Sequence, residues 1–238
     1  MLDFLAALGR WFADPAHWQG SDGIPTRVGE HLWLSGTALA AAVLIALPIG
    51  LALGHSGRGG FVAVSVANVG RALPSIALLA LCLPLAFAFG LGLGYWPTFF
   101  AMVPLGIPTI LTNAYVALRG VDRDVVDAAR GMGLGEWQVL RDAELPLAAP
   151  LIIAGVRGAA VSIVATATLG AIVASGGLGR YIVDGLARQD YPRLVAGAVL
   201  VALLALAVDH ALGLVERVVV PPGVRRRARQ QSGGATVL

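Results

Sequence analysis

Five long runs of apolar residues alternate with short polar segments along the chain. The runs cover about residues 32–53, 61–84, 97–118, 146–174 and 194–214. A helix needs about 20 apolar residues to cross the roughly 30 Å hydrocarbon layer of a membrane, so each run is long enough to span it. The pattern predicts an all-α integral membrane protein with five transmembrane helices.

The residues outside these runs form two ends and several connections. Residues 1–31 carry apolar side chains at helical spacing, namely Leu2, Leu5, Leu8 and Phe12. This spacing predicts a short amphipathic helix that lies either on the membrane surface or against the transmembrane helices. Residues 32–216 form the predicted membrane domain, and residues 217–238 form a basic tail. The glycine-rich stretch 85–96 either re-enters the membrane or connects two spans.

The composition supports this fold class and excludes some kinds of function. Of the 238 residues, 57% are hydrophobic and 13% are charged, whereas a soluble domain usually carries about 25% charged residues. All 17 basic residues are arginine. A phosphate-binding P-loop needs a lysine, so the chain has no standard ATP site. If ATP drives this protein, hydrolysis must take place on a separate chain.

No cofactor, metal or catalytic group is predicted for this chain. The single cysteine, Cys82, lies in an apolar run and fits a small core residue. The histidines show no metal-ligand spacing, and no nucleophile-elbow sequence surrounds the serines that His210 could serve in an intramembrane protease. The net charge of +3 does not indicate nucleic acid, because much of the excess lies in the tail as a typical membrane-anchoring cluster, Arg225, Arg226, Arg227 and Arg229.

The stretch from Val121 to Pro146, called the central loop below, is crowded with charge although apolar runs flank it. It reads VDRDVVDAARGMGLGEWQVLRDAELP. An unpaired charge in lipid costs several kcal/mol, so this stretch must lie outside the membrane. An ordinary solvated loop would not need the regular spacing of helix-capping residues and glycines described below. A DNA-binding helix-turn-helix is also disfavoured, because it needs an excess of positive charge that this loop lacks.

The central loop is predicted to contain two short helices joined by glycines. Asp122 or Asp124 can cap the first helix, which then carries Asp127 on its outer face. Glycine tolerates the left-handed backbone of a sharp turn, and three glycines follow, Gly131, Gly133 and Gly135. Residues 136–143 can form the second helix, with two apolar side chains on one face, Trp137 and Leu140. Pro146 fits the first turn of the next helix.

The central loop resembles the EAA loop of bacterial ABC-importer permeases. That pattern is E-A-A, three residues, G, nine residues, I, one residue, L-P. The residues that stand at the pattern's positions, with the same spacing throughout, are Asp127, Ala128, Ala129, Gly133, Leu145 and Pro146. Asp127 replaces glutamate, and Ala143 stands where the pattern has isoleucine. The second departure removes apolar area that a partner could grip.

The resemblance extends over most of the chain, from about residue 29 to residue 216. The chain is similar to MetI-like permeases with five core helices, and most similar to the branch that takes up glycine betaine, carnitine, choline and proline. The stretches that carry this similarity are 68–79 (NVGRALPSIALL), 126–159 (VDAARGMGLGEWQVLRDAELPLAAPLIIAGVRGA) and 167–190 (ATLGAIVASGGLGRYIVDGLARQD). The resemblance implies the permease subunit of an osmoprotectant importer, which transports rather than catalyses.

The same resemblance implies partners and site residues. In such systems the permease works with ABC ATPase subunits, a second permease copy or paralogue, and an extracytoplasmic binding protein. The loop docks into a cleft of the ATPase, so the expected ATPase-coupling residues are Asp127, Ala128, Ala129, Gly131, Gly133, Trp137, Leu140, Leu145 and Pro146. Replacing Gly133 with a bulky residue should uncouple ATP hydrolysis from uptake.

Arginine distribution predicts the orientation in a bacterial inner membrane. Five spans put the termini on opposite sides, and cytoplasmic segments carry the excess of arginine. With the C-terminus inside, ten arginines lie inside (Arg58, Arg119, Arg123, Arg130, Arg141, Arg217, Arg225, Arg226, Arg227, Arg229) and five outside (Arg10, Arg27, Arg180, Arg188, Arg193). The expected arrangement has the N-terminus outside and the central loop in the cytoplasm.

Polar residues inside the predicted spans are candidates for the solute pathway. The second run holds three of them, Asn68, Arg71 and Ser75, and Pro74 beside Ser75 is a further candidate. Arg157 and Asp209 lie at matching depth on the fourth and fifth runs and are predicted to pair, as an anchor or as a gate. Two alternatives stay open. One is a permease of the same fold for an amino acid or a sulfonate, and the other is an ATP-independent secondary carrier.

Overall fold

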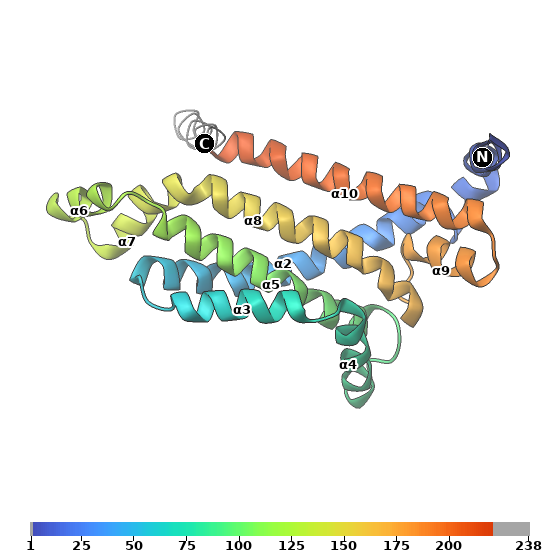
Figure 1. The fold of residues 1–238 in the computed structure, drawn as a ribbon, viewed down its shortest axis with the longest axis horizontal. Helices are drawn as coiled ribbons and strands as arrows, with labels where there is room; N and C mark the ends of the chain where they lie inside the picture. The colour runs from blue at the N-terminus through green and yellow to red at the C-terminus, as the bar shows by residue number, and fades with distance from the viewer. Residues whose placement is uncertain (1, 221–238) are drawn as a thin grey trace.

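The structure, a computed structural model, describes residues 2–220 as an elongated bundle of helices (Figure 1). At one end, called the loop end, lie α6 (Arg123–Gly131) and α7 (Glu136–Gln138). At the opposite end, called the far end, lie α1 (Leu2–Ala13), a short 3-10 turn η1 (Pro15–Trp18) and α9 (Gly179–Ala187). The arginine cluster of the predicted basic tail lies outside the described residues.

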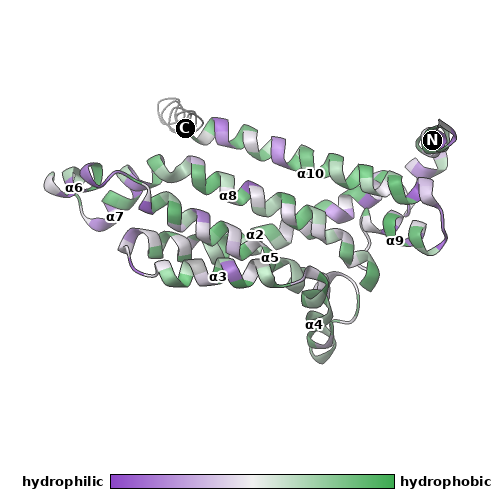
Figure 2. Cartoon of the chain, in the orientation of Figure 1, coloured by the Kyte–Doolittle hydropathy of each residue, from purple (hydrophilic) through white to green (hydrophobic). Residues whose placement is uncertain are grey.

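Four helical segments of the described chain are long and apolar enough to cross a membrane. They are α2 (Ile24–Ser56), α5 (Tyr95–Arg119), α8 (Leu145–Thr166) with the 3-10 helix η3 (Ala167–Val173) that continues it, and α10 (Tyr191–Val219). Figure 2 shows hydrophobic residues along these helices and more hydrophilic ones toward the two ends. The predicted first, third, fourth and fifth spans are confirmed.

The second apolar run does not form one continuous helix. It forms α3 (Gly60–Ala72) and α4 (Ser75–Ala88), which meet at 91°. Leu73 has an extended backbone, because a residue before proline is disfavoured in the helical region, and Pro74 then precedes the first turn of α4. The predicted second span over 61–84 is thus present as two helices with a sharp bend between them. The two helices make a fifth crossing only if they are taken together as one broken span.

The stretch after this run is partly helical. α4 continues to Ala88, and the following turn leads to α5 through residues with a left-handed backbone, Gly90, Gly92 and Gly94. α4 points away from the long axis of the bundle near the far end (Figure 1). Residues 85–96 are thus the end of a helix followed by a tight glycine turn.

Small residues bring α2 and α5 into close contact. Along α2 they recur at every fourth position, at Ala38, Ala42, Ala46, Gly50 and Gly54, and all five are buried. A Cβ atom added to Gly50 would lie 2.8 Å from both the Cβ of Ala114 and the carbonyl oxygen of Leu111 on α5. In membranes, small residues let helix backbones approach closely and gain packing contacts that lipid cannot provide. This interface forms the centre of the bundle.

Replacing Gly50 with leucine is expected to destabilise the bundle by about 1–3 kcal/mol, because overpacking a close interface forces helices apart. The measurement is thermal unfolding of the purified chain in detergent. Gly36→Leu is the matched control, because Gly36 lies on the same helix and an added Cβ meets nothing within 4 Å. Equal melting temperatures for the two variants would contradict this account of the interface.

The N-terminal helix α1 packs against other helices at the far end. Trp11 is only 8% exposed and meets the ring of Tyr181 edge to face, with centroids 5.4 Å apart. Leu8 and Phe12 pack on the same apolar cluster, which includes residues of α9 and α10. Packing against the helices is therefore the alternative that the structure favours. α2 begins at Ile24, before the first apolar run at about residue 32.

Candidate functional site

The first half of the central loop is an amphipathic helix. Asp122 caps α6, because its Oδ1 accepts a hydrogen bond of 3.0 Å from the backbone N–H of Asp124. Val126 and Ala129 are buried in an apolar cluster at the ends of α5 and α8. The side chain of Asp127 is 71% exposed on the opposite face. The predicted first helix, its cap and its exposed acid are confirmed.

The three glycines of the loop have different roles. Gly133 has a φ of 88°, a left-handed backbone, and its N–H donates a 2.9 Å hydrogen bond to the carbonyl of Arg130. Gly131 is the last residue of α6, and Gly135 has an extended backbone and caps α7. The expectation that all three glycines serve a left-handed turn is therefore wrong for two of them. The turn depends on Gly133.

The second half of the loop runs directly into a membrane-spanning helix. After α7, the π-helical turn η2 (Val139–Glu144) leads without a break to α8, with Pro146 in its first turn. The predicted second helix and the place of Pro146 are confirmed. Trp137 and Leu140 do not share one environment, because Trp137 is 70% exposed whereas Leu140 packs on the apolar cluster beneath the loop. Leu145 packs on the same cluster.

Exposed apolar side chains and a groove give the loop a surface suited to a partner. Met132 is 76% exposed. Beside it lies a groove of about 590 Å³ between α6 and the start of α8, lined by Asp124, Val125, Ala128, Ala129, Met132, Leu134, Asp142, Ala143, Pro146 and Leu147. Ala143 thus faces this groove, where an isoleucine would fill part of it. The groove is apolar and carries two carboxylates.

A bidentate ion pair fixes the two halves of the loop to each other. Arg130 Nε and Nη2 donate to the two carboxylate oxygens of Glu136, at 3.0 and 2.9 Å. The hydrogen bonds to Glu136 raise the pKa of Arg130 above its ordinary value. Asp127 lies 3.6 Å from the same guanidinium group. Paired hydrogen bonds of this kind fix orientation as well as distance.

Sequence reasoning missed a second contact that holds the loop. Glu144 is only 5% exposed, and its Oε2 lies 2.5 Å from Nδ1 of His55 at the end of α2. The other ring nitrogen of His55 lies 3.3 Å from a carboxylate oxygen of Glu136. Arg141 and Asp142 precede Glu144 closely, so nothing in the local sequence marked this acid as the buried one. Its partner lies 89 positions away in the sequence, so spacing could not identify it.

The candidate pathway residues of the second run lie around the α3–α4 break. Asn68 is exposed on α3, Pro74 lies at the break, and Ser75 begins α4. Arg71 lies on α3, and its side chain is outside the part of the chain that the structure describes. An apolar groove of about 330 Å³ between α3 and α5 lies beside them, lined by Ser65, Val66, Val69, Gly70, Leu73, Pro104, Ile107 and Pro108.

The predicted ion pair between α8 and α10 is present, and a second acid of α10 takes part in it. Arg157 donates to both carboxylate oxygens of Asp209, at 3.0 and 2.8 Å. Its third nitrogen donates to Glu216 at 2.9 Å. Gly213 lies between the two acids on α10, where a Cβ would already touch the guanidinium group at 3.4 Å. The pairing of Arg157 with Asp209 is confirmed, and Glu216 is an addition that the sequence did not reveal.

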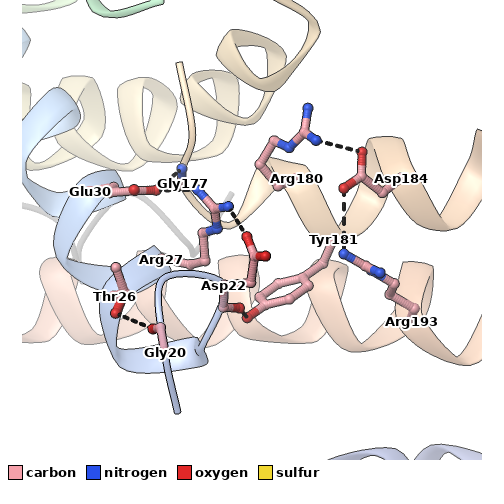
Figure 3. Close-up of polar contacts among 10 residues, drawn as sticks. All are labelled: Gly20, Asp22, Thr26, Arg27, Glu30, Gly177, Arg180, Tyr181, Asp184 and Arg193. Carbon is pink, nitrogen blue, oxygen red and sulfur yellow. Dashed lines mark hydrogen bonds and ion pairs between the residues drawn. The ribbon is translucent and has the colours of Figure 1, made fainter. Parts of the chain in front are cut away.

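A polar network ties the start of α2 to a loop at the far end (Figure 3). Glu30 accepts a 2.7 Å hydrogen bond from the backbone N–H of Gly177 and a 2.7 Å hydrogen bond from Arg27. Arg27 also pairs with Asp22, whose carbonyl accepts a hydrogen bond from the hydroxyl of Tyr181. Burial raises the pKa of Tyr181. Residues 175–193, predicted as a polar connection, thus include a helix, α9, and a fixed loop.

Comparisons with known proteins agree with this architecture. Residues 31–220 match the family described as binding-protein-dependent transport system inner membrane component. The chain is 35% identical to a glycine betaine/carnitine/choline transport system permease protein of Bacillus subtilis (strain 168), over 84% of this chain and 89% of that protein. It is 33% identical to an osmoprotectant import permease protein of Salmonella typhimurium (strain LT2), over 82% and 91% of the two chains.

Solved structures show the same fold. The inward-facing MetNI methionine ABC transporter has a chain that matches 87% of this one, with a TM-score of 0.74 and 23% identity. That match covers 99% of the transporter chain. The family implies a multi-pass permease of a bacterial membrane that works with an ATPase subunit. This chain therefore belongs to the binding-protein-dependent transport system inner membrane components, the MetI-like permeases of ABC transporters.

Proposed function

We propose that this chain forms the solute pathway of an ATP-driven importer for osmoprotectants of the glycine betaine, choline, carnitine or proline type. The observation that carries the proposal is the central loop. It presents Met132, Trp137 and an apolar groove outside the bundle, and ion pairs hold its two helices in one arrangement. A loop with exposed apolar side chains is suited to docking into a partner protein.

The proposal places ATP hydrolysis on a separate chain. The full sequence contains 17 basic residues, all of them arginine, so it lacks the lysine of a P-loop. In this proposal the docking surface is the apolar groove together with the exposed Met132 and Trp137. Of the predicted coupling residues, Ala128, Ala129 and Pro146 line the groove, whereas Leu140 and Leu145 pack beneath the loop. Closure of the ATPase subunits would move this loop and, through it, the membrane-spanning helices.

The remaining partners and the orientation belong to the same proposal. A second permease copy or a paralogue completes the pathway, and an extracytoplasmic binding protein delivers the solute. The excess of arginine in the segments next to the loop end supports a cytoplasmic central loop, with the N-terminus outside and the C-terminus inside. Asn68, Arg71, Pro74 and Ser75 at the α3–α4 break are the proposed pathway residues.

The substrate class is tested by competition in proteoliposomes that contain this chain, its cognate ATPase and its binding protein. We expect uptake of labelled glycine betaine that excess unlabelled choline or carnitine reduces. Methionine and taurine serve as competitors for the alternative amino-acid and sulfonate importers. Uptake that methionine or taurine abolishes, and that choline and carnitine leave unchanged, would assign the permease to another solute class.

A further inference from the structure

α2 is attached at the loop end to the central loop by polar contacts of His55. His55 lies in the last turn of α2, and its side chain is 18% exposed. It lies between two carboxylates of the loop, 2.5 Å from Glu144 and 3.3 Å from Glu136. Glu136 is in turn held by Arg130. A continuous chain of polar contacts thus runs from α6 through α7 to His55 at the end of α2, and from His55 to Glu144 of η2.

The positive charges around this contact come from two further elements. Arg119 of α5 and Arg123 and Arg130 of α6 line a small cavity of about 20 Å³ together with His55 and Glu144. A buried carboxylate such as that of Glu144 costs free energy unless a partner satisfies it. Separating the end of α2 from the loop would remove that partner. The contact therefore favours movement of α2 and the central loop as one unit.

α2 is attached at the far end to the loop 174–178. Glu30 accepts a hydrogen bond from the N–H of Gly177 (Figure 3). Gly176 and Gly177 have left-handed backbones, with φ of 80° and 70°. A Cβ at Gly176 would lie 2.5 Å from the carboxylate of Glu30, and one at Gly177 would lie 3.1 Å from Nδ1 of His31. The two glycines therefore allow the loop to approach α2 closely.

His31 adds a buried contact beside this one. Its side chain is 1% exposed, and its Nε2 lies 2.8 Å from the carbonyl oxygen of Val164 on α8. Between the two ends, α2 has 33 residues and is about 50 Å long at 1.5 Å per residue. Its small residues pack closely on α5 from Ala42 to Gly54. One helix thus joins a loop at each end of the bundle.

We propose that α2 transmits movement of the central loop to the far-end loop 174–178, and that His55 and Glu30 are the positioning residues at its two ends. The inference rests on the proposed function, in which an ATPase moves the central loop. α5 and α8 are joined to that loop by the chain itself. α2 follows it through its packing on α5 and through His55, so substitutions at His55 remove only the direct contact between α2 and the loop.

The test measures ATP hydrolysed per solute imported in proteoliposomes that contain the whole transporter. The variants are His55→Gln, Glu30→Gln and the double variant. Glutamine keeps a polar group at each position, so the helices should still fold. The controls remove a hydroxyl from the same turns of α2. Ser56→Ala and Thr26→Ala lose hydrogen bonds to Leu53 and Gly20, which do not belong to either attached loop.

We expect each single variant to raise the ATP-to-solute ratio by about fivefold or more, as is typical when coupling between two sites is lost. The double variant should resemble the worse single variant, because the two contacts act in series along one helix and losing either one interrupts the same path. The controls should keep the ratio of the unmodified protein. His55→Ala, which removes the contact completely, should raise the ratio further than His55→Gln.

Two results would overturn the inference. One is an unchanged ratio in a correctly assembled His55→Gln transporter, which would make the contact purely structural. The other is a double variant in which the two single effects multiply, which would show that the two ends act independently. Failure of the proposed function would be seen separately, as an unmodified transporter with no ATP-driven uptake.

Discussion

Replacing Gly133 with valine is expected to reduce coupled uptake strongly while the membrane-spanning helices stay folded. Gly133 has a φ of 88°, and an added Cβ meets nothing within 4 Å. The free-energy cost of the valine therefore comes from its backbone conformation and not from a clash with other residues. The left-handed conformation costs a residue with a Cβ about 1–2 kcal/mol, and more if it is β-branched. The turn between α6 and α7 would change to avoid that cost, and the docking surface would change with it.

The measurement is ATP-dependent uptake together with ATPase activity of the reconstituted transporter. We expect uptake to fall by about tenfold or more, since 1.4 kcal/mol corresponds to a factor of ten in an equilibrium. Gly135→Val is the matched control. Gly135 lies in the same loop, is not among the predicted coupling residues and has an ordinary extended backbone, and an added Cβ meets only Oε1 of Gln138, at 3.7 Å. Normal uptake by Gly133→Val would contradict the role assigned to this turn.

Replacing Arg157 with methionine is expected to cause the largest loss of folded protein. Asp209 and Glu216 lie on one face of α10, and both carboxylates bind the guanidinium group of Arg157. Methionine leaves two acids without that partner between membrane-spanning helices, where unpaired charge is costly. The abundance of folded protein in membranes should fall several-fold. The measurement is the monodisperse fraction after detergent extraction, together with its melting temperature.

A compensating variant tests whether the unpaired acids cause the loss of folded protein. Arg157→Met combined with Asp209→Asn and Glu216→Gln removes all three charges, so it should recover most of the lost protein. Arg188→Met, on the exposed connection before α10, is the control and should behave like the unmodified chain. Full abundance and unchanged melting of the single Arg157→Met variant would show that the three-residue cluster is not an anchor. The cluster would then be available for gating.

The parts of the fold set by local sequence were predictable. Apolar length alone located α2, α5, α8 and α10, because crossing a membrane requires a fixed number of apolar residues. The Asp122 cap and the place of Pro146 follow from preferences that act within one helical turn. The pairing of Arg157 with Asp209 was predictable from depth, since two charges inside spans need each other.

Features that depend on contacts across the bundle were not predictable in the same way. Leu73 and Pro74 signal a boundary, but whether a proline kinks or breaks a span depends on its neighbours. The contacts of His55 with Glu144 and of Glu30 with Gly177 join residues far apart in the sequence. Only the four-residue spacing of small residues along α2 was a missed local signal, because it is typical of close helix packing.

The most direct test of the central claim is the energy source of uptake. Proteoliposomes containing this chain, its ATPase and its binding protein are loaded with ATP, or with a non-hydrolysable analogue, and given labelled glycine betaine. We predict uptake against a gradient with ATP inside and none with the analogue, whether or not a proton or sodium gradient is imposed. Uptake that follows an ion gradient in the absence of ATP would contradict the assignment and identify a secondary carrier.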